Sequence, residues 1–87
     1  MEMRLCVVGA GYVGLVSGAC FADLGHTVVC VDTDRKKIEM LSNGEMPIFE
    51  PGLEALINTH LDTQQLSFSC DLAASVRDVD ALFIAVG

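Results

Sequence analysis

The stretch Gly9-Ala10-Gly11-Tyr12-Val13-Gly14 decides the fold of this 87-residue chain. It follows the wholly apolar run Leu5 to Val8, which is typical of a strand buried on both faces of a parallel sheet. The residues after the glycines have helical periodicity and end at Gly25, a residue suited to terminating a helix. A buried strand, a glycine-rich turn and a helix in this order predict the start of a parallel α/β unit.

The helix after this turn is predicted over Tyr12 to Leu24. Its apolar residues at helical spacing are Val13, Val16, Cys20 and Leu24. We expect this face to pack on the sheet, with the Cys20 thiol acting as a small buried apolar group. Gly18 is expected to pack there too, because together with Gly14 it forms a small-residue face.

The rest of the chain continues the alternation of strands and helices. Thr27 to Val31 predicts a second strand, and Asp34 is placed to cap a helix that carries Ile38 and Leu41 and closes near Gly44. Pro51 is expected to begin a third helix after a loop. Later elements are predicted as a strand over Leu66 to Ser69, a short helix capped by Asp71 and running through Val76, and a strand over Ala81 to Val86.

This order predicts right-handed parallel crossovers and a doubly wound sheet of the Rossmann type, with strand order 3-2-1-4. The last strand would leave a bare apolar sheet edge if the protein ended after it, and natural sheets avoid such edges. We therefore expect residues 1–87 to be the N-terminal part of a larger dinucleotide-binding domain, with the catalytic and substrate-binding domains beyond it.

The amino-acid composition argues against several classes of binding partner. Twelve acidic and five basic residues give a net charge of -7, which opposes binding to nucleic acid or to anionic membranes. No apolar run approaches the ~20 residues that a membrane span requires, and the first residues lack the basic and apolar pattern of a secretion signal, so we expect neither feature. Four widely spaced cysteines form no metal or redox motif. A cytoplasmic protein without a metal site is expected.

The glycine pattern predicts a dinucleotide site composed of Gly9, Ala10, Gly11, Tyr12, Val13 and Gly14. Gly9 would permit the tight turn, Gly11 would let the backbone approach a pyrophosphate, and Gly14 would let the helix lie close to the sheet. The helix N-terminus adds unpaired N–H groups and a partial positive charge, so that an acidic chain can hold an anionic cofactor. The alternative is a turn that only connects two elements.

Asp32, at the end of the second predicted strand, favours NAD. Its carboxylate can accept hydrogen bonds from both ribose hydroxyls, whereas the 2'-phosphate of NADP would meet a negative charge. The alternative is a carboxylate that only forms a turn. Arg35, Lys36 and Lys37 lie in the first turn of a helix, where cations oppose the helix dipole. Three interpretations are open. The three side chains form a solvated face, or they bind the 2'-phosphate of NADP, or one of them reaches the adenosine of the cofactor. If one residue reaches the adenosine, we favour Lys37.

These residues resemble the UDP-glucose and GDP-mannose dehydrogenase family. The glycine loop is continued by Gly18-Ala19-Cys20-Phe21-Ala22-Asp23-Leu24-Gly25-His26, which is most similar to the bacterial UDP-glucose branch of that family. The most discriminating segment is Glu50-Pro51-Gly52-Leu53, because many dehydrogenases share the glycine loop alone. It disfavours hydroxyacyl and phosphogluconate dehydrogenases. Glu50 itself is expected to cap the helix that starts at Pro51, rather than to order the loop under the cofactor.

The resemblance implies two successive NAD-dependent oxidations of a nucleotide sugar at C6, through a cysteine nucleophile that forms a thiohemiacetal and a thioester. It also implies a homo-oligomeric full-length protein. The family's catalytic segment, Gly-x-Cys-Phe-Pro-Lys-Asp, does not occur here, so no catalytic residue is expected in this chain. Cys20 imitates that segment but lacks its proline and lysine. The alternatives are a GDP-mannose or UDP-ManNAc dehydrogenase and a non-catalytic NAD-binding module.

Overall fold

Four parallel strands form one sheet in the order β3-β2-β1-β4 in the computed structural model, which describes residues 2–47 and 50–86. The strands are β1 (Arg4–Val8), β2 (Thr27–Val31), β3 (Leu66–Ser69) and β4 (Ala81–Ile84). The helices are α1 (Tyr12–Asp23), α2 (Arg35–Ser42), α3 (Pro51–Asp62) and α4 (Leu72–Ser75). The predicted fold class and strand order are therefore confirmed.

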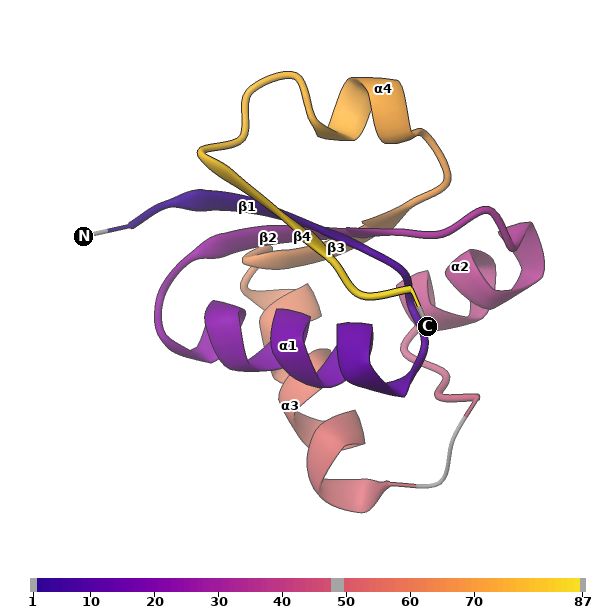
Figure 1. The fold of residues 1–87 in the computed structure, drawn as a ribbon. Helices are drawn as coiled ribbons and strands as arrows, with labels where there is room; N and C mark the ends of the chain where they lie inside the picture. Colours follow the sequence, from indigo (N-terminus) through magenta and orange to yellow (C-terminus); the bar gives the residue numbers. More distant parts are fainter. Residues whose placement is uncertain (1, 48–49, 87) are drawn as a thin grey trace.

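The two faces of the sheet are covered unequally. Helices α1, α2 and α3 lie on one side, and the single turn of α4 lies on the other (Figure 1). The buried apolar core fills the α1 side, where strand residues such as Leu5, Val28 and Leu66 stand in register across neighbouring strands. On the β4 edge Leu82 and Ile84 remain 48% and 65% exposed.

Local signals place the helix ends as the sequence predicts. Asp34 and Asp71 are N-caps, and their carboxylates accept hydrogen bonds from the backbone N–H groups of Lys37 and Ala74, at 3.1 and 3.0 Å. Pro51 is the first residue of α3, as expected, because a missing N–H costs nothing there. The cap prediction for Glu50 is wrong in one respect: the residue occupies the N-cap position, but its side chain makes no capping hydrogen bond.

The predicted packing face of α1 is wrong. Its buried residues are Gly14, Leu15, Gly18, Ala19 and Ala22. Cys20 is exposed, and Val13 and Leu24 are 64% and 74% exposed. One reason is the close approach of α1 to β2: a Cβ added at Gly18 would lie 2.6 Å from the Cys30 Sγ, so the side chain at this position must be small. Gly18 thus packs on the sheet as predicted, and Leu15 is the large side chain of α1 that is fully buried, whereas Val16 is only partly buried.

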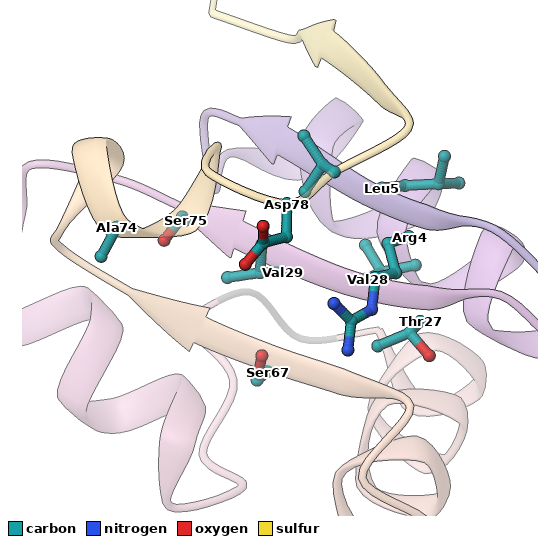
Figure 2. Close-up of a pocket in the computed structure, with 10 residues that line it drawn as sticks. Arg4, Leu5, Thr27, Val28, Val29, Ser67, Ala74, Ser75 and Asp78 are labelled. Atoms are coloured by element: carbon teal, nitrogen blue, oxygen red, sulfur yellow. The ribbon is translucent and has the colours of Figure 1, made fainter.

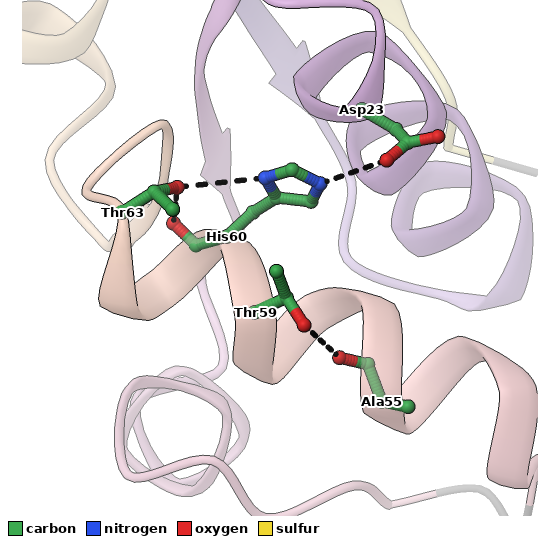
Figure 3. A network of polar contacts seen from close by, with 5 residues as sticks. All are labelled: Asp23, Ala55, Thr59, His60 and Thr63. Atoms are coloured by element: carbon green, nitrogen blue, oxygen red, sulfur yellow. Dashed lines mark hydrogen bonds and ion pairs between the residues drawn. The ribbon is translucent and has the colours of Figure 1, made fainter.

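A buried histidine joins α3 to α1, and the sequence did not reveal it. The His60 Nε2 atom lies 3.1 Å from Asp23 Oδ1, and the Thr63 hydroxyl lies 3.4 Å from His60 Nδ1 (Figure 3). His60 is only 8% exposed, whereas the Asp23 side chain is 61% exposed. This contact connects two helices through residues that are 37 positions apart in the chain.

Within the described residues, no helix has the length and apolar character of a membrane span.

Candidate cofactor site

The glycine turn lies at the carboxyl end of β1, between the ends of β2 and β4. The Gly9 N–H donates a hydrogen bond of 2.7 Å to the Val31 carbonyl oxygen. Gly9 has φ +112°, and a Cβ at this position would lie 3.0 Å from the backbone of Ala85. Both the positive φ and the lack of space require glycine here, as the sequence predicts for a tight turn.

Gly14 and Gly11 are small for different reasons. A Cβ on Gly14 would run into the Gly9 carbonyl oxygen, so Gly14 lets the first turn of α1 pack on the glycine turn itself. A Cβ on Gly11 would meet no protein atom within 4 Å. The fold therefore does not need glycine at position 11, and the open space beside it is available to a ligand.

The amino end of α1 faces that open space. Its N-cap is Gly11, in an extended conformation with φ -78° and ψ -171°, and no side chain caps the helix. The N–H groups of the first turn therefore have no intrahelical acceptor, and the helix dipole places partial positive charge at this end. Tyr12 and Val13 are 51% and 64% exposed at the same end. These are the features of an anion-binding helix terminus.

Asp32 is held by two backbone N–H groups. Its Oδ2 accepts a hydrogen bond of 2.9 Å from Ala10, and its Oδ1 accepts one of 3.0 Å from Asp34. Asp32 thus does stabilise the local turn, which was the alternative interpretation of this residue. A carboxylate offers about four acceptor sites, so acceptor capacity remains for a ligand. The Ala10 N–H is already used by Asp32, so the contribution of Ala10 to a cofactor site would be to orient that carboxylate.

The same contacts favour the ionised form of the Asp32 carboxyl group. The hydrogen bond from Ala10, followed by that from Asp34, holds the pKa of the Asp32 carboxyl below its ordinary value, and the Lys37 ammonium adds to the effect. The Lys37 Nζ lies 3.8 Å from Asp32 Oδ2, and its side chain is 30% exposed. Lys37 thus faces the predicted site, whereas Arg35 and Lys36 are exposed.

A cavity of about 130 Å³ adjoins this carboxylate at the carboxyl ends of the strands. Gly9, Asp32 and Thr33 line it, together with Cys70, which follows β3, and Leu72, the first residue of α4. The glycine pattern and Asp32 gave no indication that Cys70 and Leu72 line this cavity. The end of β3 could have indicated them, because carboxyl ends of parallel strands meet at one edge of a sheet.

The cysteines do not form a nucleophilic site with these groups. Cys6 and Cys30 are buried in the sheet, and burial raises the pKa of the Cys30 thiol to about 12. Burial also raises the pKa of Cys6. Cys70 is half-buried. Among the described residues, no group of three or more His, Cys, Asp or Glu side chains has the arrangement of a metal site.

Comparisons with known proteins agree with this geometry. Residues 3–87 match the model of the UDP-glucose/GDP-mannose dehydrogenase family, NAD binding domain. UDP-glucose 6-dehydrogenase from Pseudomonas aeruginosa is 54% identical over 98% of this chain and 19% of the relative.

Two solved structures are similar over most of the chain. A UDP-glucose dehydrogenase from Pyrobaculum islandicum has a TM-score of 0.94 and 42% identity, over 100% of this chain and 20% of the other. A ternary complex of GDP-mannose dehydrogenase from Pseudomonas aeruginosa has a TM-score of 0.93 and 44% identity, over 98% of this chain and 20% of the other chain. The chain thus spans about a fifth of the length of the relatives that it matches. It belongs to the UDP-glucose/GDP-mannose dehydrogenase family, whose NAD binding domain it matches from residue 3 to residue 87.

Proposed function

We propose that this chain is the N-terminal, NAD-binding part of an enzyme that oxidises UDP-glucose to UDP-glucuronate. The observation that carries the proposal is the 54% identity to a UDP-glucose 6-dehydrogenase, against 44% to a GDP-mannose dehydrogenase. The catalytic and substrate-binding domains then lie in further polypeptide. GDP-mannose and UDP-ManNAc are the competing substrates.

The residues of the glycine turn fit NAD, whose pyrophosphate would lie in the open space at Gly11. The first-turn N–H groups of α1, at Tyr12, Val13 and Gly14, would bind its oxygens, since they have no intrahelical acceptor. Gly9 would keep the turn tight enough to present them. When bound, NAD supplies the hydride acceptor for the oxidation.

Asp32 would accept hydrogen bonds from the two hydroxyls of the adenosine ribose. Its ionised state suits this role, because a carboxylate accepts hydrogen bonds and repels a 2'-phosphate. Lys37 lies close enough to Asp32 to limit the accumulation of negative charge beside the cofactor. This arrangement supports NAD rather than a 2'-phosphate clamp, because the inward-facing cation already neighbours a carboxylate.

The stoichiometry follows from the redox change. Oxidation of a primary alcohol to a carboxylate removes two hydride equivalents and adds one oxygen atom from water, so two NAD molecules are reduced for each sugar. The test is to measure NADH formed per UDP-glucose consumed by the full-length protein. We expect a ratio of two with UDP-glucose and little turnover of GDP-mannose or UDP-ManNAc. Turnover of another nucleotide sugar alone would contradict the substrate, and NAD binding without any turnover would indicate a non-catalytic module.

We also propose that the full-length protein is cytoplasmic and forms a homo-oligomer. All four cysteines are free thiols, which fits a reducing compartment. The family resemblance supports the oligomer, and sedimentation of the full-length protein tests it.

A further inference from the structure

A second hollow lies on the opposite face of the sheet from α1, at the amino ends of the strands. It has a volume of about 230 Å³ and is bounded by the start of β1, the start of β2, β3 and the α4–β4 connection. Figure 2 shows its side chains, with Arg4 reaching over β2 from β1 and Asp78 reaching down from the segment after α4. The hollow exists because α4 is a single turn and covers little of this face.

Opposite charges border this hollow without pairing. Arg4 and Asp78 both line it and are both exposed. Within residues 2–47 and 50–86, neither forms an ion pair within 4.0 Å. The backbone of Arg4 is fixed, because its N–H donates to Asp80 Oδ2 at 2.8 Å and its carbonyl oxygen accepts from the Asp80 N–H at 2.7 Å. Its guanidinium group is therefore carried by a fixed strand, with its charge available to a ligand.

Hydroxyl groups add hydrogen-bonding capacity to the lining of the hollow. Thr27 and Ser67 both line the hollow, and in the described part of the chain neither hydroxyl makes a hydrogen bond. Ser75 differs, because its hydroxyl donates to the Asp71 carbonyl oxygen at 2.6 Å. Val29, half-buried on β2, supplies apolar surface to the lining. The hollow therefore presents a cation, an anion, two free hydroxyls and an apolar wall.

We propose that this hollow is a second small-molecule site, which takes a zwitterion of the size of a small α-amino acid. The ligand carboxylate lies against Arg4, its ammonium group against Asp78, and its side chain against Val29. A simple anion leaves Asp78 unmatched and is opposed by the net charge of -7, and a simple cation leaves Arg4 unmatched. A zwitterion complements both groups at once.

The volume of about 230 Å³ is large enough to admit such a ligand. Both charged groups are exposed and screened by salt, so binding is weak and decreases as ionic strength rises. The site is separate from the cofactor site, because it lies at the amino ends of the strands rather than at the carboxyl ends. It does not depend on the proposed function.

The test is saturation-transfer difference NMR on the full-length protein with L-alanine as the probe. Propionate and ethylamine, which each carry only one of the two charges, are measured at the same concentrations. We expect a saturable signal for L-alanine that is stronger than either comparator. Arg4→Gln and Asp78→Asn are each expected to weaken L-alanine binding by about two- to fivefold.

Two matched variants control for general charge effects. Arg77→Gln removes a neighbouring exposed cation, and Asp62→Asn removes an exposed carboxylate, and neither residue lines the hollow. Both are expected to leave L-alanine binding unchanged. The proposal is overturned if L-alanine gives no saturable signal, as would happen if further polypeptide covered the hollow. It is also overturned if the comparators bind equally well, or if the controls weaken binding as much as Arg4→Gln does.

Discussion

The Asp32 carboxylate accepts a hydrogen bond of 2.9 Å from the backbone N–H of Ala10, a residue 22 positions earlier in the chain. This bond joins the end of β2 to the glycine turn after β1, so the two parts of the proposed NAD site are held in one geometry. The carboxylate that would bind the ribose thus also orients the turn that would bind the pyrophosphate.

Asp32→Asn tests this double role. The substitution retains the shape and one acceptor oxygen but removes the charge, so we expect NAD affinity to fall by about tenfold, since hydrogen bonds to charged groups contribute ~1.5–3 kcal/mol. The ratio of NAD to NADP affinity should also fall. Asp34→Asn makes the same chemical change at the N-cap of α2 and should leave the ratio unchanged. Titration of both cofactors by protein fluorescence provides the measurement, and an unchanged ratio in Asp32→Asn would show that the residue is only structural.

Asp32 also predicts a pH dependence of stability. Folding lowers its pKa, so its ionised form stabilises the fold above the unfolded value of about 3.9. That stabilisation is lost as the pH falls from about 4 through the lower folded value. The difference in unfolding free energy between the natural protein and Asp32→Asn should therefore be constant from pH 7 to about pH 5 and shrink below about pH 4. Urea titrations at several pH values measure it, and a difference that grows on acidification would contradict the assignment.

Gly11→Val should separate cofactor binding from folding. No protein atom lies within 4 Å of a Cβ at Gly11, so we expect a change in unfolding free energy of less than about 1 kcal/mol. NAD affinity should fall at least about 100-fold, because the side chain occupies the space assigned to the pyrophosphate. Gly52→Val is the matched control, since a Cβ at Gly52 also meets nothing within 4 Å and lies in α3. Retained affinity in Gly11→Val, measured by calorimetry, would refute the loop assignment.

Gly18→Ala should destabilise the fold without touching the proposed site. Its Cβ would lie 2.6 Å from the Cys30 Sγ, so α1 must move away from the sheet, at a cost of about 1–3 kcal/mol. Cys30→Ala removes the opposing sulfur and should recover part of that loss in the double variant. A double-mutant cycle by urea denaturation measures the coupling. Additive losses would show that the two residues do not limit the approach of α1.

His60→Ala should weaken the attachment of α3 to α1. The substitution leaves a void at a residue that is 8% exposed and removes the contact with Asp23, so we expect a loss of about 1–3 kcal/mol. Asp23→Asn should cost less than about 1 kcal/mol, because that side chain is mostly exposed. Asp62→Asn, at an exposed position of α3, is the control. Equal small effects in all three variants would mean that His60 does not join the helices.

The sequence alone determined the element order, the strand order and most helix ends. These features depend on local chemistry: an Asp at an N-cap bonds to an N–H three residues later, and Gly25 and Gly44 adopt the positive φ that ends a helix. The predicted strand Ala81 to Val86 ends earlier, at Ile84, because its partner β1 ends at Val8. Parallel strands joined by right-handed crossovers then leave few possible topologies.

Tertiary structure decided which atoms meet. The pattern Val13, Val16, Cys20 and Leu24 could not reveal that α1 approaches the sheet most closely at Gly18, since this depends on the distance between two packed elements. Likewise, the use of the Ala10 N–H by Asp32 and the burial of His60 against Asp23 join residues 22 and 37 positions apart. Periodicity specifies which residues share a face of an element, but the distance and orientation at which two elements pack select the face that is buried.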